Sequence, residues 1–161
     1  MKKSGFPPVI DKQTEILILG TLPSDNSIQV QEYYANPKNQ FWRIIFTLFN
    51  GGDPLYNYDE KVNLLLQNKI GLWDVLTKAK REGSLDSNIA EPELDDFSGL
   101  FKEYSKIRLL AFNGNPAYKY YTRMKSGLPG KSLMILASSS SMNTSRTLVQ
   151  KIQDWRSQLN I

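Results

Sequence analysis

The chain contains neither cysteine nor histidine. Without cysteine it can form no disulfide, no thiol nucleophile and no thiolate metal site. Without histidine it cannot use Ser-His-Asp or Cys-His catalysis, and nearly all zinc sites are excluded as well. Any catalysis by this chain must therefore use carboxylates, amides, hydroxyls, lysine, arginine or backbone groups.

Long hydrophobic runs are also absent. No apolar run approaches the roughly 20 residues that a bilayer-spanning helix needs. The first residues, Met-Lys-Lys-Ser-Gly-Phe-Pro-Pro, have no apolar segment after the lysines and so do not form a signal peptide. We therefore expect a cytoplasmic protein.

The overall composition is that of a globular protein. Of the 161 residues, 40% are hydrophobic and 22% are charged, which suits one domain with a proper core. We expect a single domain over residues 1–161, with an irregular N-terminal arm over residues 1–13. The net charge of +4 slightly favours polyanionic partners.

Three short apolar runs predict buried strands: Glu15–Leu19, Ile107–Phe112 and Leu133–Leu136. Runs without polar alternation are typical of strands covered on both faces, as in parallel sheets. Helical patterns lie between and after these runs. The expected fold is a three-layer α/β/α sandwich with a central, mostly parallel sheet.

The helices are predicted from apolar residues at helical spacing. They span Asn39–Phe49, Tyr58–Gln67, Glu93–Tyr104, Ala117–Met124 and a C-terminal segment. Asn115 is expected to cap the fourth helix, because Pro116 follows it at a favourable first position. Asn143 or Thr144 is expected to cap the last one.

A polar loop follows each predicted strand. These loops are Gly20–Asp25, Asn113–Asn115 and Ala137–Thr144. Taken singly, each is explained as a turn or a helix cap. In open α/β sheets, however, ligands bind outside the carboxyl ends of the strands, so three converging polar loops predict a binding site.

The residue types near these loops indicate the ligand. Tyr33 and Tyr34 are candidates to stack on a base, whereas the helical spacing of Phe41 and Trp42 indicates that at least one of them belongs to the core. Amides can read a base edge with a donor and an acceptor together. Small hydroxyls and glycine let backbone amides approach a phosphate, and Lys131, Arg146 and Lys151 flank the serine-rich loop. This combination predicts a pocket for a nucleotide flipped out of its helix.

Several motifs together resemble the uracil-DNA glycosylase superfamily, most closely its hypoxanthine-DNA glycosylase branch and next the mismatch-specific uracil-DNA glycosylases. They are Gly20-Thr-Leu-Pro-Ser24, Tyr34-Ala-Asn-Pro-Lys-Asn-Gln-Phe-Trp42, Gly71-Leu-Trp-Asp-Val-Leu76, Gly83-Ser-Leu-Asp86 and Phe112-Asn-Gly114. The resemblance implies a monofunctional DNA glycosylase that removes hypoxanthine, uracil or both in base excision repair. It implies base flipping, attack of water at the sugar C1′, no metal, no cofactor, and DNA with a damaged base as the partner. We expect a monomer.

The resemblance also implies roles for individual residues. Asn39 matches the important amide of the second motif and would position water or contact the base edge; its alternative role is a helix cap. Tyr34 would stack on the base, or else be a packed loop tyrosine. Asn113 would read the base, or else be a turn residue before Gly114.

The remaining site residues lie in two loops. Thr21, Leu22 and Pro23 would line the base, with Leu22 at the position where the mismatch-specific branch carries a water-positioning asparagine. Met142 would fill the vacated base stack, or else be a buried core residue. The residues expected to grip DNA are Ser138, Ser139, Ser140, Ser141, Met142, Asn143, Arg146 and Lys131.

Two other functions fit the same residues. One is an N-glycosidase acting on free nucleosides or nucleotides, which needs no basic rim and no wedge. The other is a non-catalytic nucleic-acid-binding member of the same fold, since Leu22 cannot position water and the last loop has no histidine.

Overall fold

A four-stranded parallel sheet forms the centre of the molecule. The computed structural model describes residues 2–4, 6–80 and 89–161, so the motif at residues 83–86 lies outside the described part. In the order β3-β2-β6-β7, the strands are β3 (Ile70–Asp74), β2 (Ile16–Gly20), β6 (Leu109–Asn113) and β7 (Ser132–Leu136). Each neighbouring pair is parallel. The three apolar runs are therefore strands as predicted, and β3 comes from the segment that carries the motif Gly71–Leu76.

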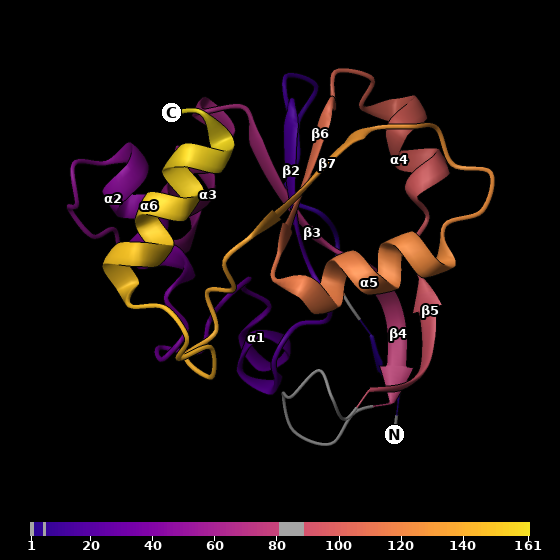
Figure 1. Cartoon of the computed structure of the whole chain (residues 1–161), viewed down its shortest axis with the longest axis horizontal. Coiled ribbons are helices and arrows are strands. Elements are labelled where there is room, and N and C mark those ends of the chain that lie inside the picture. Colours follow the sequence, from indigo (N-terminus) through magenta and orange to yellow (C-terminus); the bar gives the residue numbers. More distant parts are fainter. Residues whose placement is uncertain (1, 5, 81–88) are drawn as a thin grey trace.

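Helices cover both faces of this sheet (Figure 1). One face carries α2 (Phe41–Phe49), α3 (Tyr58–Gln67) and α6 (Leu148–Leu159), and the other carries α4 (Phe97–Glu103) and α5 (Asn115–Met124). Successive strand residues point to opposite faces. Ile16 and Ile18 accordingly belong to the core under α2, α3 and α6, while Leu17 and Leu19 belong to the core under α4 and α5. The expected three-layer α/β/α fold is confirmed.

A second, antiparallel sheet was not predicted. It joins β1 (Lys2–Ser4), β4 (Leu76–Lys80) and β5 (Ala90–Leu94) in the order β1-β4-β5. Residues 2–4 are thus a strand instead of part of an irregular arm, and Val9 forms a bridge with Leu72. The partners β1 and β4 are distant in the sequence, so no local pattern signals their pairing.

Several helix boundaries also differ from the prediction. The helix expected from Glu93 begins at Phe97, because residues up to Leu94 pair with β4 and Asp96 caps the helix by accepting from Gly99 N. A short helix, α1 (Asp25–Val30), lies at the carboxyl edge of the sheet, at the bottom of Figure 1.

The caps of α5 and α6 were assigned to the wrong residues. Gly114, with φ of 95°, precedes α5, so Asn115 is already helical. Thr147 caps α6 in a capping box with Gln150, instead of Asn143 or Thr144. In a capping box, each of the two side chains satisfies a backbone N–H of the other residue, and a single capping side chain cannot do both.

None of the helices in the described part of the chain has the length and apolar character that crossing a lipid bilayer requires.

Candidate active site

A cleft of about 830 Å³ opens at the carboxyl edge of the parallel sheet. Its walls come from the loop after β2, the end of β3, the loop after β6, the serine loop (residues 137–146, after β7) and the segment before α2. Because all four strands run in the same direction, their carboxyl ends meet at one edge. The three polar loops therefore converge, as their positions in the sequence predicted.

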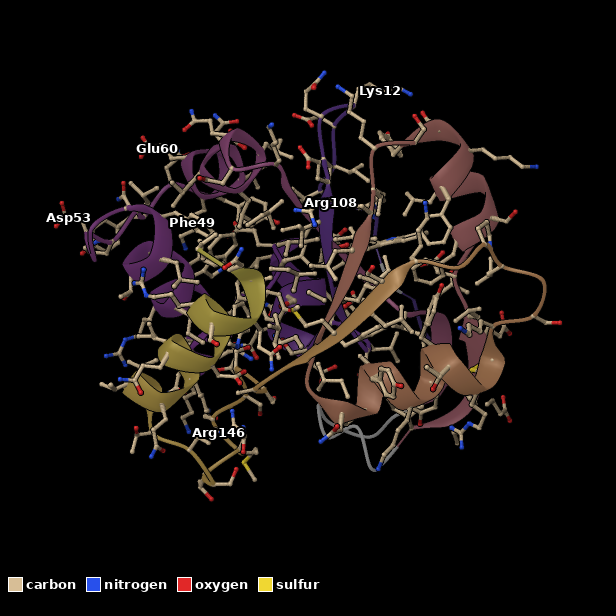
Figure 2. All side chains as sticks on the ribbon, turned by 45° about the horizontal axis from the view of Figure 1, so that its top comes forward. Lys12, Phe49, Asp53, Glu60, Arg108 and Arg146 are labelled. Atoms are coloured by element: carbon tan, nitrogen blue, oxygen red, sulfur yellow. The ribbon has the colours of Figure 1, made fainter. Side chains whose placement is uncertain are left out.

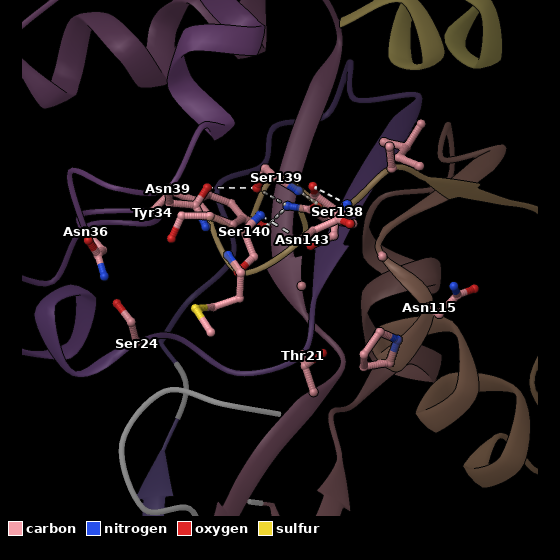
Figure 3. Close-up of a pocket in the computed structure, with 18 of the residues that line it drawn as sticks. Thr21, Ser24, Tyr34, Asn36, Asn39, Asn115, Ser138, Ser139, Ser140 and Asn143 are labelled. Atoms are coloured by element: carbon pink, nitrogen blue, oxygen red, sulfur yellow. Dashed lines mark hydrogen bonds between the residues drawn. The ribbon is translucent and has the colours of Figure 1, made fainter. Parts of the chain in front are cut away.

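A chain of hydrogen bonds joins three of these segments (Figure 3). The hydroxyl of Ser139 donates to Asn39 Oδ1 at 2.8 Å and accepts from Asn113 Nδ2, also at 2.8 Å. The backbone N–H of Ser139 donates to Asn113 Oδ1 at 2.9 Å. Ser139 is fully buried. It therefore links the two predicted amides and holds them in a defined orientation.

Both lone pairs of Asn39 Oδ1 are used within the protein. Besides the Ser139 hydroxyl, this oxygen accepts from the backbone N–H of Phe41 at 2.9 Å. The second contact is a turn bond to the first residue of α2, so Asn39 supports the start of this helix, but the N-cap position is Gln40 and not Asn39. An amide carbonyl has two lone pairs and an amide nitrogen has two donors. Among the described residues none accepts from Asn39 Nδ2, so Asn39 can offer a ligand donors only.

The amide of Asn113 is also engaged. Its Nδ2 donates to Ser139 and, at 3.2 Å, to the hydroxyl of Tyr34. Both donors of Asn113 are thus committed, and the longer bond to Tyr34 is the weaker of the two.

Tyr34 forms a wall of the cleft and is itself strained. Its φ of 55° is left-handed, which is rare for a bulky residue and costs roughly 1–3 kcal/mol. One face of its ring stacks on Phe41, with centroids 4.0 Å apart and planes at 20°. Strain of this kind clusters at functional sites.

Gly20 leaves room for the side chains of both Tyr34 and Asp74. A Cβ atom at Gly20 would lie 2.8 Å from Asp74 Oδ1 and 3.1 Å from the Tyr34 hydroxyl. Asp74, at the end of β3, is 4% exposed and lines the cleft. The absence of a side chain at the last position of β2 thus leaves space for a carboxylate that lines the cleft.

Tyr33 does not serve as a stacking residue. It is 3% exposed, and its hydroxyl donates to the carbonyl oxygen of Pro7 at 2.9 Å. Burial raises the pKa of Tyr33 far above its ordinary value. Trp42 donates from Nε1 to the Tyr33 carbonyl at 3.0 Å, and both Trp42 and Phe41 are core residues, where their spacing predicted at least one.

The first loop contributes an apolar wall. Thr21, Leu22 and Pro23 line the cleft but are buried, and Leu22 packs into the core below α4 and α5. Leu22 has no polar atom to offer a water molecule.

The serine loop holds its own shape through short-range bonds. Ser138 Oγ accepts from Ser140 N, Ser140 Oγ accepts from Met142 N, and Asn143 Nδ2 donates to the Ser138 carbonyl. Ser141 also lines the cleft. Met142 is 70% exposed at the rim, so the alternative that it is a buried core residue is wrong.

The basic residues near the serine loop are placed differently from one another. Arg146, labelled in Figure 2, is one of the residues that line the cleft, and its Nη1 pairs with Asp154 Oδ1 at 3.0 Å. Lys131 lies at the amino end of β7, where Nζ donates to the Ile107 carbonyl at 3.0 Å. The expectation that Lys131 flanks the serine loop is therefore wrong, because β7 separates the two. Lys38, which was not singled out, lines the cleft.

Lys151 is the one flanking lysine that is buried, at 1% exposed. Burial lowers the pKa of its ammonium group. A sequence signal existed for this position: Lys151 precedes the inward-facing Trp155 by four residues, so both lie on the same face of α6. Within the described residues, no three carboxylates gather as metal ligands.

The fold and the cleft define an α/β/α protein with a polar, aromatic-walled site at the carboxyl edge of a parallel sheet. A family model, the Uracil DNA glycosylase superfamily, matches residues 7–160, and the chain belongs to this superfamily. The family that the sequence motifs indicated is thus confirmed.

Similar proteins come from two species of Methanosarcina. The chain is 46% identical over 143 residues to a protein named hypoxanthine DNA glycosylase from Methanosarcina acetivorans, with 89% of each chain covered. It is 42% identical over 155 residues to a protein of the same name from Methanosarcina barkeri, with 96% of each covered. A solution NMR structure of a candidate uracil DNA glycosylase from Methanosarcina acetivorans is similar at a TM-score of 0.79 and 43% identity. That match covers 98% of this chain and 96% of the other.

Proposed function

We propose that this protein is a monofunctional DNA glycosylase that removes the deaminated bases hypoxanthine, uracil or both from DNA by base flipping. It belongs to the uracil DNA glycosylase superfamily, and two relatives at 46% and 42% identity are named hypoxanthine DNA glycosylase. The observation that carries the proposal is the hydrogen-bonded cluster of Asn39, Ser139 and Asn113 beside Tyr34 in the cleft.

The reaction suits a chain without histidine or cysteine. The bond between C1′ and the base nitrogen breaks through an oxocarbenium-like sugar, and its electron pair stays on the base. The oxygen of a water molecule then bonds to C1′ and loses a proton, which leaves an abasic site and the free base. The protein must hold the base and stabilise its growing negative charge, and fixed donors achieve this in a site that excludes water.

Asn39 suits the departing base better than the water. Its Oδ1 already accepts two hydrogen bonds, so only Nδ2 is available to a ligand. A donor stabilises negative charge on a base, whereas a donor to the attacking water would take one of its two lone pairs and make the oxygen a weaker nucleophile. We therefore assign Asn39 to the base, with Ser139 keeping its amide in that orientation.

Tyr34 and Asn113 bind the flipped base in this proposal. The ring face of Tyr34 opposite Phe41 stacks on the base, which contributes about 1–3 kcal/mol. Asn113 reads the carbonyl and N–H edge that hypoxanthine and uracil share, by exchanging its 3.2 Å bond to Tyr34 for the base carbonyl. Thr21, Leu22 and Pro23 shape the wall of the base pocket.

The serine loop contacts the DNA backbone. Its residues Ser138, Ser139, Ser140, Ser141 and Asn143 supply small polar groups and backbone amides, and Met142 is exposed for insertion into the vacated stack. Arg146 contacts phosphate from the rim. The single domain, the monomeric state and the cytoplasmic location stay predictions.

An excision panel tests the proposed activity. We expect purified protein to release hypoxanthine or uracil from duplex and single-stranded oligonucleotides, measured as abasic-site cleavage under single-turnover conditions. Undamaged adenine and cytosine in the same sequence context serve as controls. Tight binding of the damaged duplex without release of any base would instead support the non-catalytic alternative.

The salt dependence of binding tests whether DNA is the substrate. A protein that neutralises several phosphates releases their counterions, so affinity falls steeply as salt rises. We expect the affinity for a damaged duplex to fall by at least about tenfold between 50 and 200 mM salt. A flat dependence, together with hydrolysis of free deoxyinosine, would favour the nucleoside N-glycosidase instead.

A further inference from the structure

Lys151 lies behind the serine loop and touches two segments of the cleft wall at once. Its Nζ donates to the side-chain oxygen of Gln40 at 2.8 Å and to the backbone carbonyl of Ser140 at 3.1 Å. Gln40 follows Asn39 in the chain, and Ser140 follows Ser139. The lysine is therefore one residue away from each of two groups in the hydrogen-bonded cluster.

The same two segments meet directly beside the lysine. The backbone N–H of Gln40 donates to the Ser139 carbonyl at 2.9 Å, and the Ser139 hydroxyl donates to Asn39. Lys151, on α6, lies where these two segments cross, and its ammonium group bonds to both of them. Its loss would leave the crossing of residues 39–40 and 139–140 held by fewer bonds.

Stability alone does not explain a lysine at this position. Lys151 is 1% exposed on a helix face that otherwise packs into the core, beside Trp155 and Leu159. Its two acceptors are neutral, and no carboxylate in the described part of the chain forms an ion pair with it. Burying an ammonium group with neutral partners costs free energy, and an apolar residue of similar length would often be as stable or more so.

We infer that Lys151 is a positioning residue of the active site, which holds Asn39 and Ser139 in register by bonding Gln40 and Ser140. This inference rests on the proposed glycosylase function. Lys151 contacts no substrate; it acts through the direction in which Asn39 presents its donor to the base. Small displacements of a catalytic group reduce rates strongly, so the effect falls on the chemical step.

Lys151→Met tests this role, because methionine keeps the length and removes both hydrogen bonds. We expect its single-turnover excision rate to fall at least about tenfold, with the affinity for the damaged duplex changed less than about twofold. The control is Lys106→Met, which removes the same charge and also a lysine-to-glutamine bond, at 2.7 Å from Gln13, but at the opposite edge of the sheet. Lys106→Met should excise at the wild-type rate.

A double-mutant cycle separates positioning from general support of the fold. If Lys151 acts through Asn39, then adding Lys151→Met to Asn39→Ala should slow excision less than about twofold further, because coupled sites are not additive. Multiplied losses in the double variant, or an equal loss in Lys106→Met, would overturn the inference. A wild-type rate in folded Lys151→Met would overturn it too, while leaving the glycosylase function intact.

A second variant covers the case in which Lys151→Met does not fold. Gln40→Ala keeps the lysine and removes only its contact to the segment carrying Asn39, and it should lower the excision rate in the same direction. Wild-type rates in this variant would count against the link. If the wild-type protein released no base from any substrate of the panel, both the proposed function and this inference would fail.

Discussion

Asn39→Ala is expected to slow base excision by at least about 100-fold, the scale seen when one preorganised polar donor is removed from an active site. The variant loses the Nδ2 donor that faces no acceptor in the described protein, and it also frees the Ser139 hydroxyl from its acceptor. The measurement is the single-turnover release of hypoxanthine or uracil from a duplex, whichever the wild-type protein excises faster.

Asn39→Asp distinguishes a donor from an acceptor. Aspartate keeps the oxygen that accepts from Phe41 and Ser139 but has no N–H to donate. If Asn39 donates to the departing base, Asn39→Asp should lose about as much activity as Asn39→Ala. Recovery of most of the rate in Asn39→Asp would show instead that the side chain accepts a hydrogen bond from water.

The support that Asn39 gives to the start of α2 has its own control. Asn57 caps α3 by accepting from Glu60 N, far from the cleft. Asn57→Ala should lower the free energy of unfolding by about 0.5–2 kcal/mol and leave the excision rate unchanged. If Asn57→Ala and Asn39→Ala lost stability and activity in parallel, Asn39 would act only by supporting the start of α2.

Phe41→Ala is expected to lower the free energy of unfolding by about 3–5 kcal/mol, as for other buried aromatics cut to alanine. Phe41 is fully buried between Tyr34, Trp42 and Trp155, with ring centroids at 4.0, 4.8 and 5.8 Å. Urea unfolding measures the change. Phe49→Ala, on the same helix but only half-buried, should cost clearly less.

Phe41→Ala should also reduce the excision rate beyond its effect on folding. Tyr34 stacks on Phe41 in a left-handed backbone conformation, so removing that support lets the ring leave the cleft wall. We expect slower excision at a temperature where the variant is still folded by circular dichroism.

A stability loss below about 1.5 kcal/mol in Phe41→Ala would show that α2 relaxes around the vacated space.

The sequence by itself determined the central sheet and the edge that carries the site. The strands that follow Glu15 and Arg108 are nearly continuous apolar runs, and only a sheet covered on both faces buries every residue of such a run. Parallel strands then bring their following loops together. The motif around Asn39 also indicated the family from the sequence alone, because its informative residues are adjacent in the chain.

Only the tertiary structure decided which polar groups meet. Ser139 and Asn39 are 100 residues apart and share a hydrogen bond. Lys131 and Lys151 both flank the serine loop in the sequence, yet β7 takes one to the far edge, and α6 brings the other behind the cleft. The small antiparallel sheet was not predicted for a related reason, since Lys2 of β1 pairs with Lys80 of β4, far along the chain. Apolar periodicity depends on near neighbours, whereas these contacts depend on how distant elements pack, and no local pattern encodes that packing.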